Sequence, residues 1–111
     1  MGDCNRYSAN QLGALLSYMW YQKTCLPEWL GGFPVAGEDG TLRSRFKDSR
    51  LKGILRGKTG TLNDYGVYTI AGYILMPTAT YSYVILFNNM ASKYPYQHWE
   101  MEQKILEMIV P

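Results

Sequence analysis

The chain has 111 residues, 47% of them hydrophobic, with ten Tyr and three Trp. This is enough for one folded domain and too apolar for a disordered chain. A formal net charge of +2 gives no support for a nucleic-acid partner, and no run of about eighteen apolar residues could cross a membrane. With one histidine, His98, and no Cys-x-x-Cys, the sequence predicts no metal site. His98 is predicted to lie on the surface near the start of a helix, and no cofactor is predicted. Cys4 and Cys25 fit either a disulfide or two unrelated thiols.

The first predicted element is an amphipathic helix that starts after Ser8 and ends near Gln22. Ser8 and Gln11 have the spacing of a capping box, in which each side chain bonds the backbone N–H of the other residue. The apolar residues that follow recur at the spacing of one helix face: Leu12, Leu15, Leu16 and Met19. We therefore expect one face of this helix to pack against the rest of the chain.

A region of turns and loop follows the helix. Residues 27–30 suit a short helical turn with Pro27 at its first position, and Gly31-Gly32 ends it. Residues 33–46 contain the turn cluster at 37–40 and are predicted to form a long ordered loop with a helical turn around Leu42.

The second half of the chain has the pattern of strands. Three β-rich runs lie at 54–61, 67–76 and 81–88, and the short connection at 77–80 predicts an antiparallel hairpin. The run at 83–87 is apolar without alternation, so we expect both of its faces to be covered by helices. The chain is thus predicted to be a single α+β domain, residues 1–111, in which a three-stranded antiparallel sheet is flanked by an N-terminal and a C-terminal helix.

The C-terminal helix is predicted from a second amphipathic pattern. Its apolar residues share one side, which we expect to face the sheet: Trp99, Met101, Ile105, Met108 and Ile109. The opposite, solvent-exposed side is expected to carry Glu100, Gln103, Lys104 and Glu107.

The candidate site lies at Lys58-Thr59-Gly60, which directly follows the apolar start of a strand. Lysine supplies a cation and threonine a hydroxyl donor, and glycine has no Cβ, which lets a ligand approach the backbone closely. The string therefore predicts an anion site at a strand edge. The alternative is an ordinary exposed edge strand guarded by a lysine.

The flanking sequence adds a resemblance. Together with the segments 33–46, 71–74 and 84–89, Lys58-Thr59-Gly60 resembles the C-terminal part of class C low-molecular-mass penicillin-binding proteins. These are serine D-alanyl-D-alanine carboxypeptidases and endopeptidases that trim bacterial peptidoglycan. The resemblance runs from about Asn5 to Asn89. It implies part of a β-lactamase-like transpeptidase domain, and a periplasmic or otherwise extracytoplasmic protein whose signal peptide lies upstream of this chain.

The resemblance also implies roles for single residues. Lys58 and Thr59 would hold the terminal carboxylate of a stem peptide ending in D-Ala-D-Ala. Lys58 would also be a catalytic residue. Gly60 would keep the strand edge open, the backbone N–H of Thr61 would be one oxyanion-hole donor, and Leu62 would line the pocket floor. No cofactor is implied.

A second implied catalytic residue is Asn5, which matches the asparagine of the family's Ser-x-Asn motif. Asp3 stands where that motif has its serine. Two interpretations stay open: Asn5 is a remnant of the motif, or it merely precedes a helix.

The family's nucleophile motif, Ser-x-x-Lys, is expected to lie outside this chain. Ser44-Arg-Phe-Lys47 and Ser49-Arg-Leu-Lys52 have the right letters, but neither begins the buried helix that would make a lysine a base for its serine. The chain is therefore predicted to be the C-terminal portion of a carboxypeptidase, inactive alone and acylated by β-lactams only with the N-terminal part. The alternative is a non-catalytic peptidoglycan- or partner-binding module that kept the fold and lost the chemistry.

One partner prediction concerns the sheet. In the family, two strands from the N-terminal part complete the sheet beside the strand found here at 81–88. Without them the apolar run at 83–87 would form an open edge, which is a template for pairing with another chain. The sequence therefore predicts self-association through this edge, unless the helices rearrange to cover it.

Overall fold

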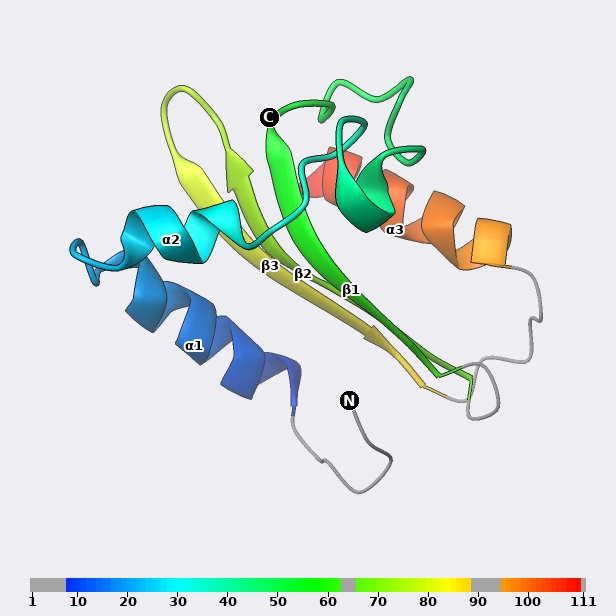
Figure 1. Ribbon diagram of the computed structural model, residues 1–111. Helices are drawn as coiled ribbons and strands as arrows, with labels where there is room; N and C mark the ends of the chain where they lie inside the picture. Colours follow the sequence, from blue (N-terminus) through cyan, green and yellow to red (C-terminus); the bar gives the residue numbers. More distant parts are fainter. Residues whose placement is uncertain (1–7, 63–65, 89–94, 111) are drawn as a thin grey trace.

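The computed structural model describes residues 8–62, 66–88 and 95–110 (Figure 1). Its sheet has two layers of helix around it: α1 (Ala9–Trp20) and α2 (Leu26–Gly31) lie on one face, and α3 (Pro95–Ile109) lies on the other with the loop that carries the 3-10 turn η1 (Gly40–Leu42). This arrangement confirms the predicted α+β class. Within the described ranges, no helix is both long enough and apolar enough to span a bilayer.

The sheet contains β1 (Leu55–Leu62), β2 (Val67–Leu75) and β3 (Thr80–Phe87), in the order β1-β2-β3 with both pairs antiparallel. Each strand begins and ends within one residue of its predicted bounds. In this register Gly57 lies opposite Gly72, and Gly72 lies opposite Tyr83. Gly57 leaves room for the Tyr83 side chain, whose hydroxyl donates a hydrogen bond to the Arg56 carbonyl at 3.0 Å, and Gly72 leaves room for the β1 backbone, since a Cβ there would lie 2.0 Å from the Arg56 carbonyl oxygen. A Cβ on Gly57 would lie 2.4 Å from that hydroxyl oxygen, so the pair of glycines is a packing requirement.

The first helix is anchored at its start and along its length. Both bonds of the predicted capping box are present, because Gln11 N donates to Ser8 Oγ at 3.1 Å and Ser8 N donates to Gln11 Oε1 at 2.7 Å. Further along, the hydroxyl of Tyr73 in β2 donates to the Leu16 carbonyl at 2.5 Å and accepts from Trp29 Nε1 at 2.8 Å. Tyr73 is 1% exposed. One buried hydroxyl thus ties α1 and α2 to the sheet.

The main core lies on the α3 face of the sheet. Its members come from the loop, the strands and α3, and include Leu42, Phe46, Leu51, Leu55, Ile70, Ile74, Tyr83 and Leu106. In β3 only the Tyr83 side chain is buried, and the other side chains of the strand are half-buried or exposed. The apolar run at 83–87 is therefore less covered than its pattern predicted. Ile85 packs against the core cluster, and β3 is an edge strand among the described strands.

The structure corrects the predicted orientation of α3. The side chains that face the sheet are His98, Glu102, Leu106 and Val110, each at most 4% exposed. Four residues predicted to be buried are instead exposed, namely Met101, Ile105, Met108 and Ile109.

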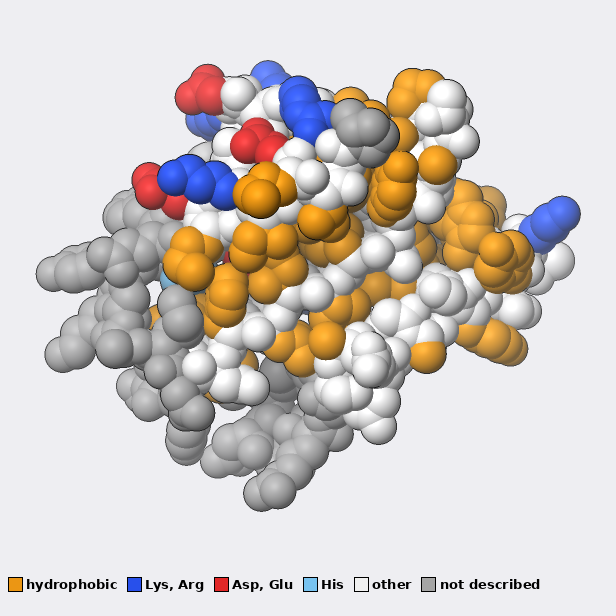
Figure 2. Space-filling model, turned by 180° about the vertical axis from the view of Figure 1, so that it is seen from behind, with side chains coloured by type: hydrophobic (Ala, Val, Ile, Leu, Met, Phe, Trp, Pro, Cys, Tyr) orange, Lys and Arg blue, Asp and Glu red, His pale blue; other side chains and the backbone are white. Residues whose placement is uncertain are grey.

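Seen from behind, hydrophobic side chains reach the surface across the middle of the molecule, while Lys, Arg, Asp and Glu gather toward its upper rim (Figure 2).

The physical reason for this correction is a buried ion pair. Arg45 in the loop donates to Glu102 Oε1 at 2.5 Å, and the two side chains are 5% and 1% exposed. The Arg45 guanidinium also lies 4.9 Å from the ring centroid of Trp99, a cation–π distance. A paired carboxylate can be buried where an unpaired one cannot, so Glu102 takes a position that an apolar pattern would assign to a hydrophobic residue. The predicted surface position of His98 was also wrong, because its ring stacks on Tyr68 with centroids 3.7 Å apart and is 2% exposed.

Candidate functional site

The outer edge of β1 is covered over its first half only. Ala36 N donates to the Leu55 carbonyl at 2.9 Å, Gly57 N donates to the Pro34 carbonyl at 3.0 Å, and Val35 forms a bridge with Arg56. Among the described residues this pairing stops at Gly57. Residues 58–62 of β1 therefore have a strand partner on the β2 side alone.

The backbone of this open stretch presents groups to an incoming ligand. Alternate residues of a strand point their N–H and C=O groups toward the same edge. Because the N–H of Gly57 points outward to Pro34, the N–H groups of Thr59 and Thr61 point outward too. Lys58 Nζ donates to the Thr59 carbonyl at 2.6 Å, which agrees with that carbonyl facing the open edge. The edge thus offers two N–H donors, those of Thr59 and Thr61, on the strand that also carries the Lys58 ammonium.

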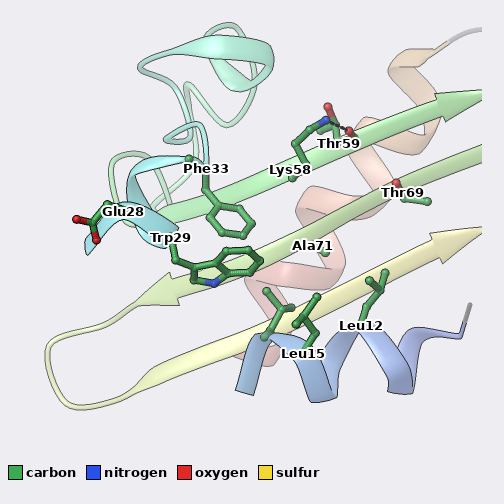
Figure 3. A pocket seen from close by; sticks show the side chains of 11 residues that line it. Leu12, Leu15, Glu28, Trp29, Phe33, Lys58, Thr59, Thr69 and Ala71 are labelled. Atoms are coloured by element: carbon green, nitrogen blue, oxygen red, sulfur yellow. Dashed lines mark hydrogen bonds between the residues drawn. The ribbon is translucent and has the colours of Figure 1, made fainter. Parts of the chain in front are cut away.

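The two side chains of the motif lie on opposite faces of the sheet. Lys58 pairs with Ala71 in the register and Thr59 with Ile70. Lys58 is exposed and Thr59 half-buried. Figure 3 shows Lys58 and Thr59 on β1 above a groove whose far wall is formed by Leu12 and Leu15 of α1.

That groove lies between α1, α2 and the sheet, with a volume of about 510 Å³. Its lining is largely apolar, with a cation and a hydroxyl at one side: Leu12, Leu15, Leu16, Trp29, Phe33 and Ala71, with Lys58 and Thr59 (Figure 3). It is large enough to accept side chains of another segment or a small ligand.

A second cavity of about 300 Å³ lies on the opposite face of the sheet. Its lining includes Thr41, Thr59 and Gly60 together with the Arg45–Glu102 pair and His98. Burial raises the pKa of Glu102, and the hydrogen bond and charge of Arg45 partly offset that rise. Burial also lowers the pKa of His98, and the Arg45 charge lowers it further. His98 Nδ1 is buried without a hydrogen-bond partner among the described residues.

The structure brings together some of the predicted site residues and leaves others untested. Lys58, Thr59 and Gly60 lie on the open edge of β1, with the backbone of Thr61 beside them. The side chains of Thr61 and Leu62, and the whole of Asn5, lie outside the described residues, as does any pairing of Cys4. The other cysteine, Cys25, is described, and it is exposed just before α2.

One contact of the motif was missed in the sequence. Thr59 Oγ1 donates to Thr41 Oγ1 at 3.1 Å. Thr41 belongs to η1, eighteen residues earlier in the chain. A pattern of local spacing carries no signal for a contact between residues eighteen positions apart.

As predicted, neither Ser-x-x-Lys string has the setting of a nucleophile. Ser44 and Ser49 lie in turns and bends and start no helix. The Ser49 hydroxyl donates to Glu107 Oε2 at 2.5 Å and accepts from Leu51 N at 3.1 Å. Its potential base, Lys52, is exposed. Ser49 thus fixes α3 to the loop.

Comparison with known proteins identifies the family of the chain. Residues 2–105 match the model of the D-Ala-D-Ala carboxypeptidase 3 (S13) family. The chain is 32% identical over 89 residues to a D-alanyl-D-alanine carboxypeptidase of Actinomadura sp. (strain R39), an alignment that spans 76% of this chain and 15% of the relative.

A solved structure shows the same fold. Penicillin binding protein 4 of Haemophilus influenzae, crystallised with a β-lactam, superposes with a TM-score of 0.85 at 21% identity, over 98% of this chain and 27% of that one. The chain therefore spans a small part of the length of these proteins. With both the family model and the Actinomadura relative in agreement, the chain belongs to the D-Ala-D-Ala carboxypeptidase 3 (S13) family.

Proposed function

We propose that this chain is the C-terminal portion of a serine-type D-alanyl-D-alanine carboxypeptidase that remodels peptidoglycan outside the cytoplasm. The observation that carries the proposal is the open edge of β1, where Lys58 and Thr59 stand beside outward-pointing backbone N–H groups. Family membership supports the reaction class, since the Actinomadura relative carries the name of that activity.

In this proposal a stem peptide pairs with the open edge of β1 as an added strand. Its terminal carboxylate lies between the Lys58 ammonium and the Thr59 hydroxyl, which supply charge and a hydrogen bond. The Thr61 N–H then donates to the oxygen of the carbonyl under attack, as one oxyanion-hole donor. The positions of a cation and outward N–H donors along one edge support this order.

The nucleophile in this proposal comes from a part of the protein beyond these residues. The groove between α1 and β2 leads to Lys58 and has an apolar wall, so a helix that carries Ser-x-x-Lys could pack there with its serine beside the edge. Asn5 would complete the site if it is the second-motif asparagine. Without that helix the chain binds the peptide and does not cleave it.

A second candidate function is a non-catalytic module that binds peptidoglycan or a partner through the same edge. It is supported by the lack of a nucleophile among the described residues, where the Ser49 hydroxyl is engaged by Glu107 and Ser44 lies in a turn, and by Asp3 at the position of the motif's serine. The sequence upstream of this segment distinguishes the candidates, since a Ser-x-x-Lys at the start of an apolar helix is expected only for the enzyme.

The binding site is tested by titrating the chain with acetyl-D-Ala-D-Ala while amide shifts are followed by NMR. We expect weak binding, with a Kd of about 1 mM or more, and shifts concentrated at residues 58–61. Lys58→Met should abolish the shifts, while Lys47→Met, at an exposed loop position, should leave them unchanged. Shifts that spread evenly over the surface, or that persist in Lys58→Met, would contradict the site.

The inactivity of the chain is tested with a labelled penicillin and with release of D-alanine. Intact-mass spectrometry should find no covalent adduct, because no hydroxyl among the described residues has a lysine base beneath it in a buried helix. An adduct on Ser44 or Ser49 would contradict this part of the proposal.

A further inference from the structure

Thr41 is the residue outside the motif whose side chain contacts the motif's hydroxyl. The two hydroxyl oxygens are 3.1 Å apart, and Thr59 is the donor. Both residues also line the cavity on the α3 face of the sheet. Thr41 itself is exposed, so its side chain is available at the same surface that the peptide would approach.

The turn that carries Thr41 is held firmly in place. Leu42, its neighbour, is fully buried in the core, and the Leu42 carbonyl accepts from Gly37 N at 2.9 Å. Asp39 Oδ1 accepts from Val35 N at 2.6 Å, which fixes the turn to the segment that pairs with β1. Gly40 has φ +57° and a Cβ there would lie 2.8 Å from Pro34 Cγ. The Thr41 hydroxyl is therefore positioned by the core and by β1 itself.

The direction of the bond between the two hydroxyls matters for binding. A hydroxyl has one hydrogen to donate and two lone pairs that accept. While Thr59 donates to Thr41, it cannot donate to a carboxylate. When Thr59 turns its hydrogen to a carboxylate, its oxygen becomes an acceptor for the Thr41 hydroxyl at the same distance. Thr41, Thr59 and the carboxylate then form a chain of hydrogen bonds, whose members strengthen one another.

We propose that Thr41 is a positioning residue for carboxylate recognition, whose hydrogen bond with Thr59 reverses when the ligand binds. This inference rests on the proposed carboxylate site. It assigns Thr41 a part in distinguishing a free C-terminal carboxylate from an amide, because the carboxylate accepts only and requires the Thr59 hydrogen. An amide NH₂ can instead donate to Thr59 and leaves the bond to Thr41 as it is.

The test compares wild type, Thr41→Val and Thr41→Ser. Each is titrated by NMR with acetyl-D-Ala-D-Ala and with its C-terminal amide. Thr41→Val keeps the side-chain shape and removes the hydroxyl, so it should weaken binding of the acid by about three- to tenfold and leave binding of the amide unchanged. Thr41→Ser keeps the hydroxyl and should bind the acid within about twofold of wild type.

A double-mutant cycle completes the test. In a Thr59→Val background, Thr41→Val should have no further effect on binding of the acid, because Thr41 acts through Thr59. Equal loss of acid and amide binding in Thr41→Val, or no loss of either, would overturn the inference and leave the carboxylate site standing. A wild-type chain that shows no acid-dependent shifts at residues 58–61 would overturn both.

Discussion

The two faces of the sheet are built in different ways. On the α3 face, a continuous core encloses a buried ion pair, Arg45–Glu102, with His98 beside it. On the α1 and α2 face, an apolar groove stays open and one buried hydroxyl, that of Tyr73, joins the helices to the sheet. We therefore expect the α3 face to carry most of the stability. It also holds the cavity of about 300 Å³ beside Thr59, whereas the groove of about 510 Å³ on the other face leaves more room for another segment or a ligand.

The largest loss of stability is expected when one partner of the ion pair is removed. Arg45→Met leaves Glu102 buried without its cation, and we expect the free energy of unfolding to fall by about 3–5 kcal/mol. Denaturant unfolding measures the change. Arg43→Met, two residues away and exposed, is the matched control and should stay within about 0.5 kcal/mol of wild type. An Arg45→Met protein as stable as the control would show that the pair is dispensable.

A smaller effect is expected on the open face. Tyr73→Phe removes the hydroxyl that bonds Leu16 and Trp29, and should lower the free energy of unfolding by about 1–3 kcal/mol. Amide exchange should speed up in α1 before it does in α3. Tyr21→Phe, at a residue 75% exposed, is the control. Equal acceleration in both helices would mean that the two faces do not unfold separately.

The faces should also differ in their response to acid. The pKa of His98 is lowered in the folded protein from its ordinary value of 6.5, by burial and by Arg45. The folded state therefore resists protonation that the unfolded chain accepts, so stability present above pH 6.5 is lost as the pH falls below it.

This acid effect is measured against His98→Gln, by following the free energy of unfolding from about pH 7.5 to about pH 5. The nearby Glu102 titrates in both proteins and has a raised pKa, whose effect on stability has the opposite sign. The difference between the two curves therefore isolates His98. We expect a steeper loss in wild type. Parallel curves would exclude the histidine as the source.

The weakest predicted effect is self-association at the edge of β3. Sedimentation should show a concentration-dependent increase in mass, because β3 is an edge strand among the described strands and its neighbour on one side is missing there. Ser82→Lys, at an exposed position of β3, should favour the monomer, whereas Ser44→Lys in the loop should not. Ile85→Lys is expected to unfold the chain instead, since Ile85 packs on the core. A wild-type monomer at every concentration would contradict this prediction.

Elements set by neighbouring residues could be predicted from the sequence. The capping box of Ser8 and Gln11, the three strands and the placement of Lys58 to Gly60 on one strand depend on local spacing. The orientation of α3 could not, because the burial of Glu102 depends on Arg45, fifty-seven residues away. The contact of Thr41 with Thr59 was missed for the same reason. A pattern of apolar residues detects a helix face only where polar groups stay in water.

The short pairing of residues 34–36 with β1 sets a limit on length. Since the Pro34 carbonyl already accepts from Gly57 N, a strand added at this edge can advance only as far as residue 58. About five residues of β1 are left to it, or about 17 Å at the rise of an antiparallel strand. The same stop limits the register in one direction, because an added strand that slid past residue 58 would have to displace a hydrogen-bonded segment. The edge of β1 therefore accepts only a short added strand, and that strand must end at residue 58.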